Sequence, residues 1–552
     1  MSGFNLADLF ERVTDAAPDR EAVVSHAPNG SVSPARRLTY RELDERSNRL
    51  AHALTELGVG AGDHIGLQLL NGSEYIEGML AAFKIRAVPI NVNCRYVEAE
   101  LRHLYDDADL VAVIHHREFS PRVGEAAAGV GKVEHLIVVD DKSGAIVADG
   151  AHGYEDLLDG AAAERPDGSP RTGDDLYLAY TGGTTGLPKG VMWRQEDIFF
   201  AAMGGGDVFQ SGNFIKTPEE IVERLPEVGA TILTTPPLMH VSAQWGVFSQ
   251  LFGGGRIVFP PPGAFDPDTV WDLVQSESIN VLTIVGDAMA RPLADSFATA
   301  KDRGAPYDVS SLIVIGSGGA TLSSTAKGKL AELLPTLMIV DGFGSSETGI
   351  VGNKLHAAGD ESTQPRFTVN AQTNVLDDNG RPVEPGSGNV GRLARKGHVP
   401  LGYYKDETKT KTTFLEIDGE RWVLPGDNAI VEEDGTVVLL GRGSTSINTG
   451  GEKVYPEEVE TALMTSAEVA DAVVVGLPDE RWGERVVAVV KPKPGAEPSL
   501  EALQEHVRSS LARYKAPRAL VLVEAIERTP AGKPDYKWAR EIAEKNAAKR
   551  PL

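Results

Sequence analysis

The sequence contains a single cysteine, Cys94, among its 552 residues. One cysteine excludes an intrachain disulfide framework and agrees with a reducing, cytoplasmic environment. No histidine stands beside it in the sequence as a catalytic partner. We therefore expect Cys94 to be a buried packing residue and not a nucleophile.

Positive charge is also scarce, since 54 Lys and Arg face 79 Asp and Glu, giving a net charge of -25. This balance argues against nucleic acid as the main partner, although a local basic cluster could still bind an anionic small ligand. No uninterrupted apolar run approaches the roughly 18 residues of a membrane span. The first ten residues lack the basic start and apolar core of a signal peptide, which predicts a cytoplasmic protein. Peripheral membrane contact and a homodimer remain compatible with the sequence.

The sequence does contain short apolar runs, typical of buried strands, that alternate with segments whose apolar residues recur at helical spacing. Strands are expected over 64–70, 87–92, 111–114 and 135–139, with helices over 41–54 and 74–83 between or before them. Such alternation predicts mainly parallel sheets flanked by helices, whose ligands gather at the carboxyl ends of the strands. Further buried strands are expected over 231–233, 281–285, 312–315 and 338–340.

Residues 200–228 form an unusual segment that begins with a run of glycines and continues into Ile215–Arg224. The latter pattern predicts an amphipathic helix capped by Thr217, with Pro218 in its first turn. The segment could form a lid or wall of a substrate pocket. A surface insertion without a role explains it equally well.

The length of the chain requires two or more domains. Small residues over 441–446 predict a linker, and a helix opening at Pro456 follows it. Strands over 472–477, 485–492 and 519–523 and a helix over 500–511 predict a small α+β unit. The expected fold class is therefore α/β: a large N-terminal domain of several subdomains (1–440), a hinge (441–446) and a small mobile C-terminal domain (447–552).

The most informative stretch is Ala179–Val191, which follows the short strand pattern Leu176–Tyr180. Its glycines, threonines and one lysine suit a loop that cradles an anion with backbone N–H groups, hydroxyls and charge. The spacing differs from GxxxxGK[ST], because Pro188 precedes Lys189 and Gly190 follows it. From composition alone, a surface turn rich in small residues is the simpler interpretation.

Three other stretches carry residues suited to chemistry. The segment 341–349 offers an aromatic face in Phe343 and a carboxylate in Glu347, a hard ligand for Mg²⁺, although a solvated glutamate is the plainer alternative. His240 follows Pro236, Pro237, Leu238 and Met239, where packing is the commoner role of a histidine. Lys533 lies in Thr529–Pro534 near the end of the chain, where most lysines are simply solvated.

Taken together, these strings resemble the motifs of adenylate-forming enzymes, the acyl-CoA synthetase family, in family order over roughly residues 36–540. The segment 341–349 is similar to the family's Tyr-Gly-x-Thr-Glu motif, with Phe343 in place of Tyr and Ser346 in place of Thr. Pro425 departs from the Thr-Gly-Asp motif, and Ser444 and Asn448 depart from the family's hinge region. The string Ile447–Pro456 and the glycine-rich segment are most similar to bacterial fatty-acyl and steroid side-chain CoA ligases.

The resemblance implies a role for each matching residue. Catalytic residues would be Lys533, Glu347 and Thr181, of which Glu347 and Thr181 reach the metal. ATP or AMP would contact Thr181, Gly182, Gly183, Thr184, Thr185, Gly186, Lys189, Gly318, Gly319, Ala320, Asp341, Gly342, Phe343, Gly344, Ser345, Ser346, Asp427 and Arg442. The acyl group and coenzyme A would contact His240, Trp245, Gly316, Gly450 and Gly451, and Ser444 would be the hinge residue.

The implied reaction joins a carboxylic acid to coenzyme A at the expense of ATP, with Mg²⁺ as cofactor. The carboxylate attacks the α-phosphorus, pyrophosphate leaves, and the thiol of coenzyme A then displaces AMP. The preferred acid is a medium or long acyl chain or a bulky alicyclic acid, including a steroid side chain, with an aryl acid as the alternative. A carrier-protein loading enzyme, a luciferase-like oxidase and a catalytically silent nucleotide-binding regulator remain alternatives that the sequence leaves open.

Overall fold

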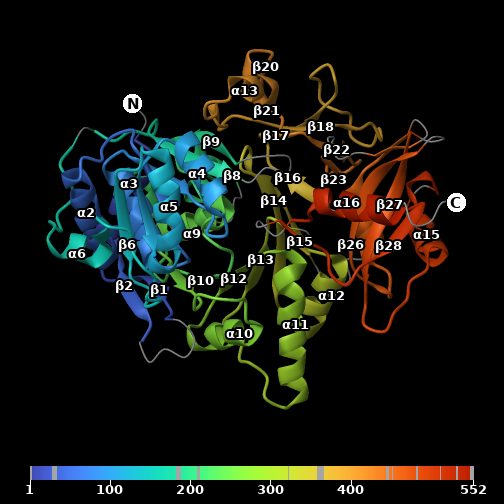
Figure 1. Cartoon of the computed structure of the whole chain (residues 1–552), viewed down its shortest axis with the longest axis horizontal. Helices are drawn as coiled ribbons and strands as arrows, with labels where there is room; N and C mark the ends of the chain where they lie inside the picture. The colour runs from blue at the N-terminus through green and yellow to red at the C-terminus, as the bar shows by residue number, and fades with distance from the viewer. Residues whose placement is uncertain are drawn as a thin grey trace.

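The protein is described by a computed structural model in which three β-sheets carry the helices (Figure 1). The structure describes residues 3–27, 34–168, 170–181, 188–207, 212–320, 322–356, 366–442, 447–449, 452–479, 483–509, 511, 513–529 and 533–547. Figure 1 shows the N-terminal elements in blue on one side and the C-terminal elements in red on the other, with the green strands and helices between them.

The eight-stranded sheet contains the predicted run of parallel strands. Its order is β19-β9-β8-β4-β3-β5-β6-β7. The strands are β3 (His64–Gln68), β4 (Val88–Asn91), β5 (Leu110–His116), β6 (His135–Val139), β7 (His152–Gly153), β8 (Leu176–Thr181), β9 (Lys189–Arg194) and β19 (Gly402–Tyr403). Strands β8, β4, β3, β5, β6 and β7 pair in parallel, whereas β9 returns antiparallel to β8. The carboxyl end of β8 therefore lies at the edge where ligands of parallel sheets gather.

The fifteen-stranded sheet is parallel in one half and antiparallel in the other. Its parallel strands are β1 (Glu21–Ser25), β11 (Arg256–Phe259), β10 (Thr231–Thr234), β12 (Val281–Ile284), β13 (Val314–Ser317) and β14 (Met338–Ser345). Its antiparallel strands are β2 (Arg36–Thr39), β15 (Gly349–His356), β16 (Arg366–Val369), β17 (Thr373–Leu376), β18 (Gly391–Lys396), β20 (Phe414–Ile417), β21 (Glu420–Val423), β22 (Asp427–Val431) and β23 (Val437–Arg442). The antiparallel half was not predicted, because its strands are short and carry many exposed polar residues.

Helices cover both sheets. They are α1 (Leu6–Ala16), α2 (Tyr40–Glu56), α3 (Ser73–Lys84), α4 (Glu98–Asp107), α5 (Ser120–Val130), α6 (Tyr154–Asp159), α7 (Gln195–Ala202), α8 (Glu220–Glu223), α9 (Val241–Phe252), α10 (Pro267–Ser276), α11 (Gly286–Asp302), α12 (Ser324–Leu333) and α13 (Glu407–Thr413). The predicted helices over 41–54 and 74–83 are confirmed as α2 and α3. A Thr39–Glu42 capping box starts α2 and explains its boundary.

The predicted helix over 215–224 was wrong. Only one turn forms, α8, and it is not capped by the side chain of Thr217. The N–H of Ile215 donates to the carbonyl of Gly205 at 2.9 Å, so the start of the segment is tied to the glycine turn and does not enter a helix. Ile215 and Ile221 are both buried in the main core, and Arg12 of α1 pairs with Glu219 at 2.9 Å. The segment is therefore packed against α1.

Two boundaries near the predicted site also differ. Strand β13 begins at Val314 and not at Leu312, because the N–H groups of Ile313 and Val314 both donate to Asn280. Strand β14 continues to Ser345, so residues 341–345, which read as a polar turn, lie in the sheet. Asp341 is thereby paired on both sides, with Ser317 of β13 and Lys354 of β15, whereas Gly342–Ser345 pair with β15 alone.

The C-terminal elements form a sheet of their own. Its strands are β24 (Ile447–Thr449), β25 (Glu452–Val454), β26 (Val469–Asp479), β27 (Gly483–Pro492) and β28 (Ala519–Leu522), and its helices are α14 (Pro456–Met464), α15 (Leu500–Arg508) and α16 (Tyr536–Ala547). Two apolar clusters lie within it, which confirms the expected small α+β unit. At Gly441, φ is +98°, a backbone conformation that favours glycine, and the carboxylate of Glu457 on α14 lies close to this residue of β23. The boundaries at 440 and 447 stay a prediction.

The environment of Cys94 and the lengths of the helices bear on two of the predictions. Cys94 is buried, and burial raises the pKa of its thiol to about 12, which confirms a packing role. In the part of the chain that the structure describes, no helix combines the length and apolarity needed to cross a bilayer.

A buried ion cluster yields a stability prediction. Lys84 has no exposed side-chain surface, and its Nζ lies 2.6 Å from both Glu11 and Asp44. Lys84→Met leaves two buried carboxylates with less compensating charge, so it should lower the free energy of unfolding by about 3 kcal/mol. The control is Lys411→Met, whose side chain is 78% exposed beside Glu407, and it should change stability little. Urea denaturation that gives equal losses for the two variants would contradict the prediction.

Candidate active site

The predicted phosphate loop lies in the hairpin between β8 and β9. Thr181 ends β8 and pairs with Lys189, the first residue of β9. The side-chain amide of Asn91 accepts from the N–H of Tyr180 at 2.8 Å and donates to its carbonyl at 2.7 Å. These bonds hold the end of β8 just before the loop. The loop residues Gly182, Gly183, Thr184, Thr185 and Gly186 lie outside the described residues.

Lys189 has a carboxylate partner from a distant part of the chain. Its Nζ lies 2.5 Å from Asp406, and this hydrogen bond is the main cause that lowers the pKa of Asp406 below its usual range. Asp406 follows β19, which pairs with β9 through Tyr403 and Val191. An incoming polyphosphate would share Lys189 with an ionised carboxylate.

The segments predicted to face adenine lie on neighbouring parallel strands. Ser317 of β13 pairs with Asp341 of β14, and a Cβ added at Gly318 would lie 3.6 Å from the carbonyl of Gly342. After Gly318, Gly319 is exposed and Ala320 is half-buried. Gly316 lies on β13, directly before Ser317. Bare backbone of this kind leaves room for a flat ring. Whether adenine binds there stays a prediction.

Two side chains border this backbone surface. Asp341 accepts from Nζ of Lys327 at 2.7 Å, and burial raises the pKa of its carboxyl despite that partner. The ring of Phe343 packs against Phe367 with centroids 5.3 Å apart. Phe343 is only partly buried, so some of its surface stays open for stacking.

The turn after β14 carries Glu347 and is held at successive residues. The indole N–H of Trp193 donates to the carbonyl of Ser346 at 2.9 Å. The hydroxyl of Tyr403 donates to Oε1 of Glu347 at 2.9 Å. Ser345 contacts Thr348 through its N–H and its hydroxyl, each at 3.0 Å. The turn is also tight, because a Cβ at Gly344 would lie 2.2 Å from the carbonyl of Gly349.

The residues present fit a magnesium ion held mainly by a nucleotide. Oε1 of Glu347 is engaged by Tyr403, and no described residue donates to Oε2. Within the described ranges, no group of three or more His, Cys, Asp or Glu side chains could hold a metal by itself. Mg²⁺ commonly uses one or two carboxylates together with substrate phosphates. Glu347 is accordingly a residue that would hold it, and the role of Thr181 as a second ligand stays a prediction.

Asp427 and Arg442 lie opposite one another on β22 and β23. Asp427 is largely buried, and the side chain of Arg442 lies outside the described part of the structure. Both strands belong to the sheet of β13 and β14, in the order β13-β14-β15-β16-β23-β22. This sheet connects the predicted ribose-binding pair to the predicted adenine surface.

His240 precedes α9, and a second amide holds its loop. Asn91 donates to the carbonyl of Met239 at 2.8 Å, so one buried side chain joins the His240 loop to the end of β8. Asn71 accepts from the N–H of Leu238 at 2.7 Å. Trp245 is buried on the first turns of α9.

The charge of the C-terminal lysine acts on His240. Burial, together with the positive charges of Arg95 and Lys533, lowers the pKa of His240 to about 4. Lys533 is exposed and its carbonyl accepts from the N–H of Thr529 at 2.8 Å. An amine from the small unit therefore lies within electrostatic range of a histidine in the large one. The remaining predicted residues, Ser444, Gly450 and Gly451, lie outside the described residues.

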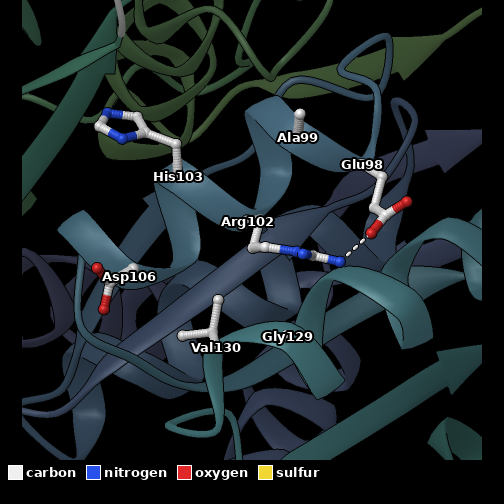
Figure 2. A pocket seen from close by; sticks show the side chains of 7 residues that line it. All are labelled: Glu98, Ala99, Arg102, His103, Asp106, Gly129 and Val130. Carbon is white, nitrogen blue, oxygen red and sulfur yellow. Dashed lines mark hydrogen bonds and ion pairs between the residues drawn. The ribbon is translucent and has the colours of Figure 1, made fainter.

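A surface pocket of about 520 Å³ lies elsewhere, against α4 and the end of α5 (Figure 2). It is lined by Glu98, Ala99, Arg102, His103, Asp106, Gly129 and Val130. Arg102 is turned toward Glu98, with which it forms an ion pair (Figure 2). None of the predicted site residues lines this pocket, and we assign no ligand to it.

Several residues that contact the site were not selected from the sequence. They are Asn91, Trp193, Arg395, Tyr403 and Asp406. Each acts through a contact with a residue far away in the sequence, which local composition cannot indicate. For Tyr403 and Asp406, the sequence offers one signal: the string Gly402–Asp406 combines glycine, two aromatic residues and two charged residues. No role was predicted for this string.

The effect of the Lys533 charge on the pKa of His240 yields a prediction. In the intact protein, the imidazole of His240 should titrate near pH 4, and Lys533→Ala should raise its pKa because one nearby positive charge is removed. The matched control, Lys537→Ala, removes an exposed lysine from α16 and should leave the titration unchanged. Histidine-selective NMR titrations measure all three proteins. Identical curves would show that the charge of Lys533 does not reach His240.

Comparison with known proteins agrees with the predicted resemblance. Residues 10–404 match the family described as AMP-binding enzyme, and residues 458–533 match the AMP-binding enzyme C-terminal domain. The chain is 47% identical over 543 residues to a 3-oxocholest-4-en-26-oate–CoA ligase of Rhodococcus rhodochrous, covering 97% of this chain and 95% of the relative. It is 46% identical to a medium/long-chain-fatty-acid–CoA/3-oxocholest-4-en-26-oate–CoA ligase of Mycolicibacterium smegmatis, covering 99% and 97%.

A solved structure shares the fold. The crystal structure of ATP-bound MatB from Rhodopseudomonas palustris has a TM-score of 0.81 and 24% identity, covering 98% of this chain and 99% of that one. The predicted fold class is thus confirmed for both the large and the small unit. With its two family matches in chain order and relatives that align over nearly its full length, the chain belongs to the AMP-binding enzyme family.

Proposed function

We propose that the protein is an AMP-forming acyl-CoA synthetase that activates a carboxylic acid with ATP and transfers it to coenzyme A. The observation that carries the proposal is the position of the Glu347 turn beside the phosphate hairpin, since Tyr403 pairs with Val191 of β9 and donates to Oε1 of Glu347. The preferred acid is a medium or long acyl chain or a bulky alicyclic acid such as a steroid side chain. The names of the relatives from Rhodococcus and Mycolicibacterium support this choice.

The first step requires alignment and charge neutralisation more than proton transfer. The acid is already ionised near pH 7, so it needs no general base to attack the α-phosphorus. Lys533 would stabilise the negative charge that develops on the α-phosphate, and Lys189 with the loop after Thr181 would hold the leaving pyrophosphate. Mg²⁺, held by Glu347 and Thr181, would supply further neutralisation of phosphate charge.

The second step reuses the same site. His240 remains neutral at pH 7 because its pKa is near 4, so it serves as a wall of the substrate site and not as a cation. Rotation of the small unit about residues 442–446 would withdraw Lys533 and bring Gly450 and Gly451 to the pantetheine. The thiol then displaces AMP from the acyl-adenylate. We place this chemistry in the cytoplasm, where ATP and coenzyme A are available.

Loss of the tail amine should separate the two steps. Lys533→Ala should lower the rate of acid-dependent pyrophosphate release by about 10²–10³, the usual effect of removing one group that stabilises transition-state charge. Formation of thioester from supplied acyl-adenylate should be spared. Lys537→Ala serves as the control and should affect neither step. Equal loss of both steps in Lys533→Ala would remove the lysine from its role in adenylation.

A screen of acids tests the substrate class. Acids of graded chain length, steroid side-chain acids and aryl acids are each supplied with ATP, Mg²⁺ and coenzyme A, and thioester is measured by mass spectrometry. The proposal expects the highest kcat/KM for medium, long or alicyclic acids. Preference for aryl acids would replace the substrate assignment, and transfer to a carrier protein but not to coenzyme A would replace the acceptor. Nucleotide binding without pyrophosphate release for any acid would favour a regulatory protein.

A further inference from the structure

Two adjacent tyrosines, Tyr403 and Tyr404, make comparable bonds in different places. The hydroxyl of Tyr403 donates to Oε1 of Glu347 at 2.9 Å. The hydroxyl of Tyr404 donates to Oδ2 of Asp109 at 2.8 Å, and Asp109 is not one of the predicted site residues. Neighbouring residues of an extended chain point in opposite directions, which explains the divergence. Only one of the two bonds therefore reaches a predicted site residue.

The ring of Tyr403 is fixed from several directions. It is 4% exposed, and its N–H donates to the hydroxyl of Thr410 at 2.8 Å. Phe414 packs edge-on with ring centroids 5.7 Å apart, and Nζ of Lys409 lies 4.3 Å from the ring centroid. Backbone pairing with Val191 ties the residue to β9. These contacts hold the phenol ring, and therefore its hydroxyl group, in a fixed position.

The same short segment also reaches the phosphate hairpin. Asp406, three residues after Tyr403, accepts from Lys189 at 2.5 Å. The N–H of Tyr404 donates to the carbonyl of Gly190 at 2.8 Å. Residues 403–406 consequently contact both charged groups that the proposed function assigns to the phosphates and their metal, Lys189 and Glu347.

We propose that Tyr403 is a positioning residue that orients the Glu347 carboxylate for binding of the Mg²⁺–ATP complex. The inference rests on the proposed function, because it takes Glu347 as the residue that holds the metal. With Oε1 engaged by the phenol, the carboxylate is ordered before nucleotide arrives, and Oε2 is left to bind the metal. Pre-ordering reduces the conformational entropy lost on binding.

The test compares Tyr403→Phe with Tyr404→Phe, two variants that each remove one hydroxyl. The probe is Mn²⁺ with the non-hydrolysable analogue α,β-methylene-ATP, and the readout is the Mn²⁺ dissociation constant from electron paramagnetic resonance. Tyr403→Phe should weaken Mn²⁺ binding about tenfold, the effect expected for losing a hydrogen bond to a charged group. Tyr404→Phe should stay within about twofold of the parent protein. Glu347→Gln, the reference variant, should weaken binding at least as much as Tyr403→Phe.

A second pair of measurements separates positioning from a general structural effect. Binding of the analogue in EDTA should be the same for both tyrosine variants, and their urea midpoints should be similar. In the adenylation reaction, Tyr403→Phe should raise the Mg²⁺ concentration for half-maximal rate, and saturating Mg²⁺ should restore most of kcat. Equal Mn²⁺ affinities in the two variants, or an equal loss of metal-free nucleotide binding in Tyr403→Phe, would overturn the inference. Absence of acid-dependent pyrophosphate release in the parent protein would instead overturn the proposed function and leave the Mn²⁺ comparison interpretable.

Discussion

The buried guanidinium of Arg395 fixes the chain directly after Glu347 and joins it to the end of α7. Arg395 is 3% exposed, and its Nη1 donates to the carbonyls of Thr348 and Ile350 at 2.7 and 2.6 Å and to Ala201 at 3.3 Å. Burial lowers its pKa to about 10, which leaves the group charged at neutral pH. A charged donor shared by three carbonyls joins the end of α7 to the turn, and removing it would take the arginine donor away from buried acceptors, of which Ile350 would keep the bond from Asn370. The close approach also requires Gly349, where an added Cβ would lie 2.7 Å from the carbonyl of Ala201.

Side chains from two sheets hold the Glu347 turn. The eight-stranded sheet contributes Trp193 and Tyr403, which bond to Ser346 and Glu347, while Arg395 belongs to the fifteen-stranded sheet. Bonds from three elements to consecutive residues of one turn leave it little conformational freedom. A small movement of one sheet against the other would therefore change the position of the Glu347 carboxylate. The residues that hold the turn are accordingly as important to the proposed chemistry as the carboxylate itself.

The parts of the fold with a strong local signal could be predicted from the sequence. The apolar runs that became β3, β5 and β6 are buried parallel strands, and the helical pattern after Thr39 is α2. The one-turn α8 could not be predicted, because a long-range bond between Ile215 and Gly205 outweighs the local helical pattern. Candidate site residues were found where a short motif carries them, as with Glu347. The residues that orient them, such as Arg395 and Tyr403, contact the turn across long sequence separations, so no local pattern marks them.

The glycine-rich segment after α7 is joined to the Glu347 turn through the end of α7. Gly204, Gly205 and Gly206 all have positive φ, and a Cβ at Gly205 would lie 2.7 Å from the ring of Phe200. The turn therefore depends on glycine to pack against the aromatic residues of α7. Ala201, which precedes it, is the residue whose carbonyl is shared with Arg395 and lies against Gly349. Because α7 thus connects this segment to the Glu347 turn, substitutions that repack the turn at 204–206 would also shift the Glu347 carboxylate.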